Sequence, residues 1–137
     1  MSDKKTFFEF SVATSRKEQM INVTEKICDL VRAGGIRSGL CCIHLPHTTA
    51  ALTINENADP DVPDDIISGM RSSVDDSLPY RHVEGNSPAH IRSSLFGVNL
   101  NLIINDGRLM LGTWQGVFLC EFDGPRKRNI FVKIVEG

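Results

Sequence analysis

The 137-residue sequence has no long hydrophobic run and no C-x-x-C motif. Its apolar runs are far shorter than the roughly 18 residues that a transmembrane helix needs, so we expect no membrane span. Residues 1–10, MSDKKTFFEF, lack the apolar segment of a secretory signal peptide. We therefore expect a cytoplasmic protein with reduced, mostly buried cysteines. The four cysteines are Cys28, Cys41, Cys42 and Cys120.

An excess of charge of one sign is also missing, since the formal net charge is −2 and the sequence pI is about 6.1. No broad positive field predicts binding to nucleic acid or to an anionic membrane. The one basic cluster, Arg126-Lys127-Arg128, is interpreted as a solvated turn. The sequence shows no repeat and no linker, and its length suits one domain, residues 1–137, with a sizeable core.

Alternation of apolar and polar residues predicts that β-strands dominate. In the first such segment, Phe8, Phe10 and Val12 alternate with polar residues. The turn sequences Asp106-Gly107 and Asp123-Gly124-Pro125 separate later segments, as expected between antiparallel strands. The predicted strands are residues 6–12, 20–23, 39–45, 50–55, 98–104, 108–111, 117–122 and 129–135.

Three short helices are predicted between these strands from apolar residues at helical spacing. The first has Thr24 as its expected N-cap and ends at Gly34-Gly35. The second and third open with Asp59-Pro60 and Ser87-Pro88, each an N-cap residue followed by proline, and run to about residues 73 and 96. Together the elements predict an α+β fold with a mainly antiparallel β-sandwich or jelly-roll-like core.

Three of the four histidines lie where predicted elements begin or end, which is where binding sites collect. His47 follows a strand, His82 lies between two helices and His90 lies in the first turn of the third helix. These imidazoles could converge on a divalent metal, zinc or magnesium, with one position left for water or substrate. They could instead bind phosphate beside the free N–H groups of the helix that opens at Ser87. His44, inside a strand, is interpreted as a polar residue on a strand face.

The stretch HTTAALTINENADPDV, residues 47–62, is rich in polar residues for a simple strand and turn. The strand within this stretch is interpreted as structural, and the residues at its two ends as candidate functional residues. At one end, Thr48 accompanies His47 as a candidate ligand-binding residue. At the other, Glu56 could orient an imidazole or act as a general base, or could be a solvated loop carboxylate. Asp59 has a structural role as an N-cap as well.

The stretch GTWQG, residues 112–116, holds the only tryptophan of the chain between two glycines. Trp114 is expected to belong to the core. Thr113 and Gln115 would alternate onto one strand face, where they could donate hydrogen bonds to a ligand. Further along, Arg126 is suited to a bidentate clamp on phosphate or carboxylate.

Three blocks of the sequence together resemble the YjbQ family: HTTAALTINENADPDV, HVEGNSPAHIRSSLFG and GRLMLGTWQGVFLCEFDGPRKR. The family is commonly labelled secondary thiamine-phosphate synthase. The resemblance implies a β-sandwich-like α+β domain and a homo-oligomer, with a trimer favoured. It also implies that three residues occupy the family's histidine positions: His47, His82 and His90. The family's polar motif positions fall on Glu56, Asp59, Thr113, Gln115 and Arg126.

The resemblance implies an enzyme that couples a hydroxymethylpyrimidine diphosphate to a thiazole phosphate and releases pyrophosphate. Arg126, the helix start at Ser87 and protonated histidines or a divalent metal would stabilise the departing anion. Glu56 or a histidine would be the acid or base. Two alternatives stay open. One is a metal-dependent hydrolase with a three-histidine site, and the other is a protein that binds a phosphorylated metabolite without chemistry.

Overall fold

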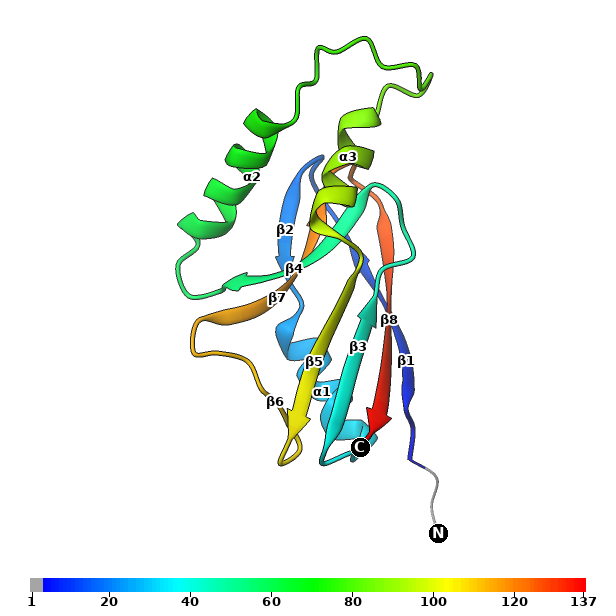
Figure 1. Ribbon diagram of the computed structural model, residues 1–137, viewed down its shortest axis with the longest axis vertical. Coiled ribbons are helices and arrows are strands. Elements are labelled where there is room, and N and C mark those ends of the chain that lie inside the picture. The colour runs from blue at the N-terminus through cyan, green and yellow to red at the C-terminus, as the bar shows by residue number, and fades with distance from the viewer. Residues whose placement is uncertain (1–3) are drawn as a thin grey trace.

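The computed structural model describes residues 4–137 and consists of two antiparallel β-sheets with three helices (Figure 1). The larger sheet has the strand order β1-β8-β3-β5-β6 and the smaller has the order β2-β7-β4. The strands are β1 (Phe7–Ala13), β2 (Gln19–Asn22), β3 (Gly39–His44), β4 (Ala50–Glu56), β5 (Asn99–Asn105), β6 (Arg108–Leu109), β7 (Gln115–Glu121) and β8 (Lys127–Glu136).

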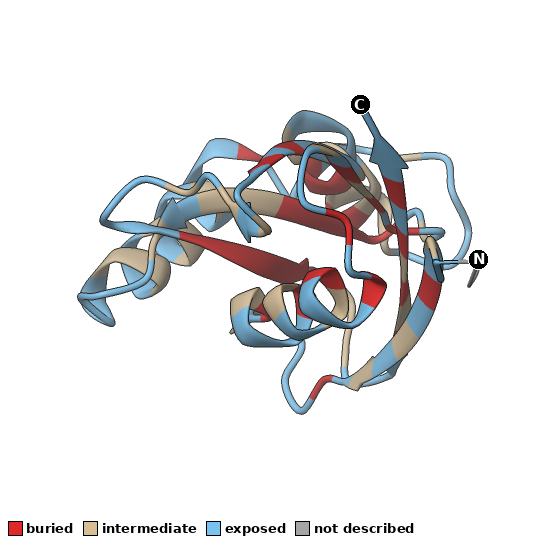
Figure 2. Cartoon of the chain, turned by 90° about the horizontal axis from the view of Figure 1, so that it is seen from below, coloured by how far each residue is buried: buried red, intermediate tan, exposed pale blue. Residues whose placement is uncertain are grey.

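The main core lies between the inner faces of the two sheets. In β8, Ile130, Val132 and Ile134 are buried, while the residues between them are exposed or half-buried. They pack with side chains of the smaller sheet, among them Leu52 and Leu119. Figure 2 shows this alternation of buried and exposed residues along the strands. The period of two in the sequence is therefore the period of burial in the sheet.

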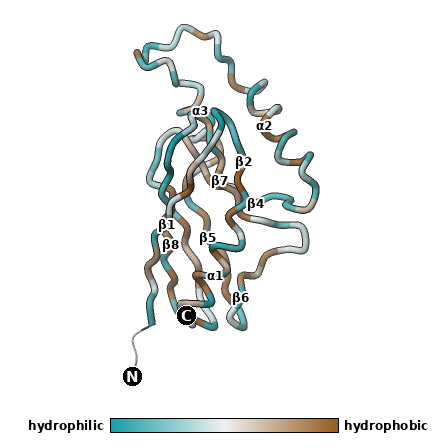
Figure 3. The backbone as a smooth tube through the Cα atoms, turned by 180° about the vertical axis from the view of Figure 1, so that it is seen from behind, coloured by the Kyte–Doolittle hydropathy of each residue, from teal (hydrophilic) through white to brown (hydrophobic). Residues whose placement is uncertain are grey.

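The three helices differ in how far they are packed. Helix α1 (Thr24–Gly34) buries Ile27 and Val31 in the main core. Helix α3 (Ser87–Phe96) covers the outer face of the smaller sheet, where Ala89 packs in a second apolar cluster with Phe118. Helix α2 (Asp61–Ser73) has no buried residue and stands away from the sheets (Figure 3). Its predicted apolar stripe is therefore only half covered.

The predicted α+β class, with an antiparallel two-sheet core and three short helices, is confirmed. Several predicted helix starts are wrong by one residue, as is usual at frayed ends. Thr24 is the first residue of α1 and not its N-cap, because its Oγ1 accepts the N–H of Val117 in β7 at 2.8 Å. Pro60 and Asn86, not Asp59 and Ser87, are at the N-cap positions of α2 and α3.

The prediction that Trp114 belongs to the core is wrong, since its exposed fraction is 62%. Residue Trp114 lies in the turn before β7, and its carbonyl accepts the N–H of Asn57 at 2.9 Å. The glycine at the start of β7 does mark a close approach, because a Cβ on Gly116 would lie 2.6 Å from the Nδ2 of Asn57. The predicted strand 108–111 is also shorter, ending at Leu109.

All four cysteines are free. Cys41 and Cys120 are buried as predicted, whereas Cys28 and Cys42 are half-buried. Burial raises the pKa of both Cys41 and Cys120 to about 12, so these two thiols are uncharged at neutral pH. Within residues 4–137, the helices are too short or too polar for any of them to cross a membrane.

Candidate functional site

The fold brings the three predicted site histidines to the end of the molecule that carries α3 (Figure 1). His47 lies in the turn that leads from β3 to β4, His90 lies on α3, and His82 lies in the long connection from α2 to α3. The rings of His82 and His90 are 5.3 Å apart between centroids and nearly perpendicular, at 88°. His47 lines the same hollow as His90. The structure thus pairs His82 with His90 and places His47 and His90 around one hollow, while His47 and His82 line different hollows.

Two hollows that share His90 form the candidate site. The inner hollow, of about 510 Å³, is lined by His47, Thr48, His90, Ser93, Ser94, Gly97 and Val98. The outer hollow, of about 410 Å³, is lined by Tyr80, His82, Ser87, His90 and Ile91. Both volumes suit a small ligand. Hydroxyl and imidazole groups line both hollows, so the site can form hydrogen bonds with a polar ligand from several directions.

One hydrogen bond fixes the chemistry of His47. Its Nε2 accepts the backbone N–H of Asn129 at 2.8 Å. Burial, together with the charges of Arg128 and Arg126, holds the pKa of His47 below its ordinary value of 6.5. The ring is therefore neutral at pH 7, with its lone pair committed at Nε2 and its proton on Nδ1. His47 can offer an N–H to a ligand without being charged.

The residues of this site do not fit a bound metal ion. A metal ligand must offer a free lone pair, and the Nε2 lone pair of His47 already accepts a hydrogen bond. In the part of the chain that the structure describes, no three His, Cys, Asp or Glu side chains are grouped closely enough to hold a metal ion. The imidazole and hydroxyl groups of the two hollows can donate hydrogen bonds to an anion, and one carboxylate, that of Glu84, lies 3.9 Å from His82 Nε2.

The start of α3 contributes its dipole to the site rather than free N–H groups, because Pro88 has no N–H and the next two amides are bonded within the helix. The amides of Ala89 and His90 both donate to the carbonyl of Asn86, at 3.0 and 3.3 Å. The side chain of Asn86 in turn donates to Asp123 Oδ2 at 2.9 Å, which ties the start of α3 to the turn between β7 and β8. Ser87, the first residue of α3, lines the outer hollow. The positive end of the helix dipole therefore lies beside His82 and His90.

A buried polar network lies behind His47, and its residues were not predicted as part of the site. The exposed fractions of Arg128 and Glu121 are 2% and 0%, and Arg128 Nε donates to Glu121 Oε2 at 2.8 Å. Burial alone would raise the pKa of Glu121, but hydrogen bonds from Arg128, the amide of Asp123 and Thr14 hold it below its ordinary value. The interpretation of residues 126–128 as a solvated turn is thus wrong for Arg128.

Arg126 lies close enough to influence His47 but is already occupied. Its Nη2 donates to Asp123 Oδ2 at 3.0 Å, and its Nε donates to the carbonyl of Asp123 at 2.9 Å. Its backbone N–H donates to Thr14 Oγ1 at 2.9 Å. The guanidinium predicted to clamp a phosphate therefore clamps a carboxylate of the same chain, and a ligand would have to compete with Asp123 for it.

The other predicted site residues lie at the far end of the smaller sheet. Glu56 and Gln115 are paired across β4 and β7, while Ala50, next to the histidine turn, pairs with Glu121 at the opposite end. Six residues of strand separate Glu56 from Ala50, which corresponds to roughly 20 Å. Within one chain, the carboxylate of Glu56 therefore does not lie with His47. Three other predicted site residues lie near Glu56 and form a second group with it: Asp59, Thr113 and Gln115.

Members of this second group have local structural roles. Asp59 Oδ1 accepts the N–H of Asp61 at 2.9 Å, so Asp59 has a local structural role just before α2 although Pro60 holds the N-cap position. Gln115 Oε1 accepts the N–H of Gly112 at 2.8 Å, which closes the turn before β7. Thr113 is exposed in that turn.

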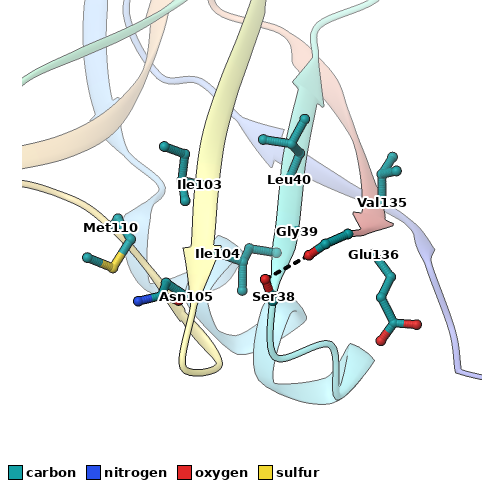
Figure 4. Close-up of a pocket in the computed structure, with 10 residues that line it drawn as sticks. Ser38, Gly39, Leu40, Ile103, Ile104, Asn105, Met110, Val135 and Glu136 are labelled. Carbon is teal, nitrogen blue, oxygen red and sulfur yellow. Dashed lines mark hydrogen bonds between the residues drawn. The ribbon is translucent and has the colours of Figure 1, made fainter.

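An apolar hollow of about 500 Å³ lies at the opposite end of the larger sheet (Figure 4). Leu40, Ile103, Met110 and Val135 line most of it, and the bond from Ser38 Oγ to the carbonyl of the last residue closes its edge at 2.7 Å. It contains none of the predicted site residues. Its polar lining residues are Ser38, Asn105 and Glu136, and none of them is a cation that would attract a phosphorylated ligand.

Comparison with known proteins gives consistent matches along most of the chain. Residues 8–137 match the family profile described as UPF0047 protein YjbQ-like. The chain is 44% identical over 131 residues to UPF0047 protein MJ1081 of Methanocaldococcus jannaschii, covering 96% of this chain and 95% of that protein. It is 44% identical over 129 residues to UPF0047 protein YugU of Bacillus subtilis, covering 90% and 95%. A YjbQ/UPF0047 family crystal structure from Clostridium acetobutylicum is similar with a TM-score of 0.91 and 48% identity, covering 93% of this chain and 99% of that one.

Proposed function

The chain belongs to the YjbQ-like UPF0047 family, as its sequence blocks predicted, and from this premise we propose that it binds the phosphate groups of a small molecule in the two histidine hollows. We propose further that it has a weak thiamine-phosphate synthase activity, with release of pyrophosphate. The observation that carries the proposal is the hydrogen bond from Asn129 to His47, because it leaves a neutral ring with its N–H free for an anion. The proposal places the protein in the cytoplasm, where its four free cysteines would stay reduced.

The chemistry of this transfer matches the groups at the site. The carbon–oxygen bond to the diphosphate breaks, and a carbon–nitrogen bond to the thiazole nitrogen forms. The attacking nitrogen carries no proton, so the reaction needs donors for the leaving pyrophosphate and no general base. His47 offers Nδ1–H in the inner hollow, which it shares with His90, and His82 and the start of α3 line the outer hollow on the other side of His90. In this proposal Glu56, at the far end of β4, has no role as a base.

Binding without turnover is the second candidate. It is favoured by the same anion-suited groups and by the separation of Glu56 from the histidines, because no carboxylate of the predicted set is placed to move a proton. The hydrolase alternative is not carried forward, since the residues do not fit a metal ion.

Calorimetric titration with pyrophosphate is the direct test of the site. The wild-type protein should bind pyrophosphate, and His47→Ala and His90→Ala should each weaken binding by about tenfold, the effect of losing a charge-assisted hydrogen bond. His44→Ala is the matched control, because His44 is exposed on the outer face of the larger sheet and interacts with Asn99. Equal affinities in all four proteins would contradict the proposal.

A turnover assay then separates the two candidates. Transferase activity predicts pyrophosphate release from hydroxymethylpyrimidine diphosphate only when thiazole phosphate is present, and less release with His47→Ala. Saturable binding with no release in any mixture would leave the protein as a binder of phosphorylated metabolites. Release without thiazole phosphate would indicate hydrolysis and would overturn the transferase proposal.

A further inference from the structure

We propose that the buried Arg128–Glu121 pair is a positioning unit for His47, which holds the imidazole so that Nδ1–H faces the ligand phosphate. The inference rests on the proposed function of the histidine hollows. It assigns a task to two charged side chains that lie behind the site and do not line either hollow.

The pair is fixed in one geometry by several hydrogen bonds. Arg128 presents both Nε and Nη2 to the two carboxylate oxygens of Glu121. Each oxygen has one more partner, because Oε2 accepts from Thr14 Oγ1 at 2.9 Å and Oε1 accepts the N–H of Asp123 at 3.0 Å. A fork-shaped guanidinium bound in this way cannot rotate without breaking two bonds at once. The second N–H of Arg128 Nη2 therefore points in a defined direction.

That N–H reaches the turn that carries His47, where the two oxygens of Thr49 share it. Arg128 Nη2 donates to the carbonyl of Thr49 at 3.1 Å and to its Oγ1 at 2.9 Å. The next residue of β8, Asn129, donates its backbone N–H to His47 Nε2 at 2.8 Å. Two consecutive residues of β8 thus hold both ends of the three-residue turn 47–49. The carbonyl of Thr49 also accepts the N–H of Phe122 at 3.2 Å, so movement of Arg128 would remove the side-chain bonds that orient Thr49 and would loosen the turn that carries His47.

Stability alone does not explain this pair. A buried ion pair in a β-sandwich loses the hydration of both charges, and apolar residues of similar volume are often as stable or more so. The inward positions next to Arg128 along β8 are the apolar residues Ile130 and Val132, so the sheet accepts such side chains there. What apolar residues could not supply is the directed bond to Thr49. The charged groups that face His47 include Arg126 as well as the pair itself.

Two kinds of variant test the positioning role. Thr49→Val removes the Oγ1 that Arg128 binds while keeping the size of the side chain. Thr53→Val is its matched control, because no side-chain hydrogen bond of Thr53 is found among the described residues. The double variant Glu121→Gln/Arg128→Met removes both charges together, which leaves no unpaired buried charge. A ¹H–¹⁵N spectrum of each variant reports whether the fold is kept.

The decisive measurement is the ¹⁵N chemical shift of the two ring nitrogens of His47, which distinguishes the Nδ1–H from the Nε2–H tautomer. In the wild-type protein and in Thr53→Val we expect the Nδ1–H tautomer. In Thr49→Val and in a folded double variant we expect a mixture of tautomers, with pyrophosphate binding weaker by about three- to tenfold. A merely structural role would change the stability but not the tautomer.

The outcomes separate this inference from the proposed function. A His47 ring that is in the Nε2–H form in the wild-type protein overturns the inference. So does a Thr49→Val variant with wild-type tautomer and wild-type pyrophosphate affinity. If Thr49→Val changes the tautomer but no protein binds pyrophosphate, the positioning unit stands and the proposed phosphate ligand fails.

Discussion

A histidine ring can donate, accept or coordinate, and the partner of one nitrogen decides what the other can do. In His47 the backbone of Asn129 takes the lone pair, and burial and nearby arginines keep the ring neutral. The folded-state pKa lies below 6.5, so acidification below that value favours the unfolded chain, which binds the proton more readily. The residue is therefore a neutral donor at pH 7.

Glu121 makes a testable contribution to stability. Replacing it by Gln should lower the free energy of unfolding at pH 7 by about 3–5 kcal/mol, because Arg128 is then buried without a counter-charge. The pKa of Glu121 is depressed in the folded state, so its stabilisation is complete above the ordinary value of 4.5 and is lost as the pH falls below it. Urea titrations at several pH values measure both effects.

Glu136→Gln is the control for this prediction. Glu136 pairs with Lys4 at the exposed end of the larger sheet, so the loss should be under about 1 kcal/mol. Two results would contradict this energetic role of the buried pair. One is a Glu121→Gln variant that is as stable as Glu136→Gln. The other is a Glu121→Gln variant that loses as much stability in acid as the wild-type protein does.

Part of the candidate site could be predicted from single residues, and the reason for the rest is physical. His47, His82 and His90 lie at element ends, and such ends meet when strands are antiparallel and helices short. Glu56 also lies at a strand end, but at the opposite one, and sequence position does not reveal which end. Arg128 was misjudged as solvated although it is two residues before Ile130, which places it on the inward face of β8.

At the scale of elements, α3 links the site to the sheet. Its buried residues Ala89 and Ser93 face β4, while His90 points to the hollows. Ser93 Oγ donates to the carbonyl of Ala50 at 2.6 Å, and both groups are buried. Ala50 begins β4 and follows the turn 47–49, so this bond connects the helix that carries His90 with the strand that follows His47.

We expect Ser93→Ala to lower the free energy of unfolding by about 1–3 kcal/mol, because the carbonyl of Ala50 would be left buried without its partner. Ser94→Ala is the matched control: its hydroxyl donates to the carbonyl of His90 on an exposed part of the same helix, so the change should be within about 0.5 kcal/mol. Thermal and urea unfolding of the two variants measure the difference. Equal losses would show that the bond to β4 does not hold α3 in place.

The strands and helices themselves were largely predictable, and the exceptions have identifiable causes. Strict alternation, as in β1 and β8, reflects one buried face, and this pattern is visible in the sequence. Strand β6, predicted to span residues 108–111, has only two residues, because the chain then enters the turn that carries Trp114. The apolar residues at helical spacing correctly predicted helix α2, but amphipathic spacing does not reveal how much of a helix face the rest of the chain covers.

At the scale of the whole molecule, the histidine site and an apolar surface lie at opposite ends of the larger sheet (Figures 1 and 4). Register places Leu40 opposite both Ile103 and Val135, so these three side chains form one row across three strands. Each is about half exposed, and together with Met110 they make a continuous apolar surface. Surfaces of this kind are typical of association.

The family resemblance predicts a homo-oligomer, with a trimer favoured, and we expect a second copy of the chain to cover this apolar row. Ile103→Lys should then reduce the mass measured by light scattering toward that of a monomer, because a charge would be buried without a partner. Val83→Lys is the control, since Val83 is 97% exposed in the connection between α2 and α3 and lies outside the row. An unchanged mass with Ile103→Lys would show that another surface forms the oligomer, and a monomeric wild-type protein would contradict the expectation itself. Because the row lies at the end of the sheet opposite to His47, we expect Ile103→Lys to keep wild-type affinity for pyrophosphate.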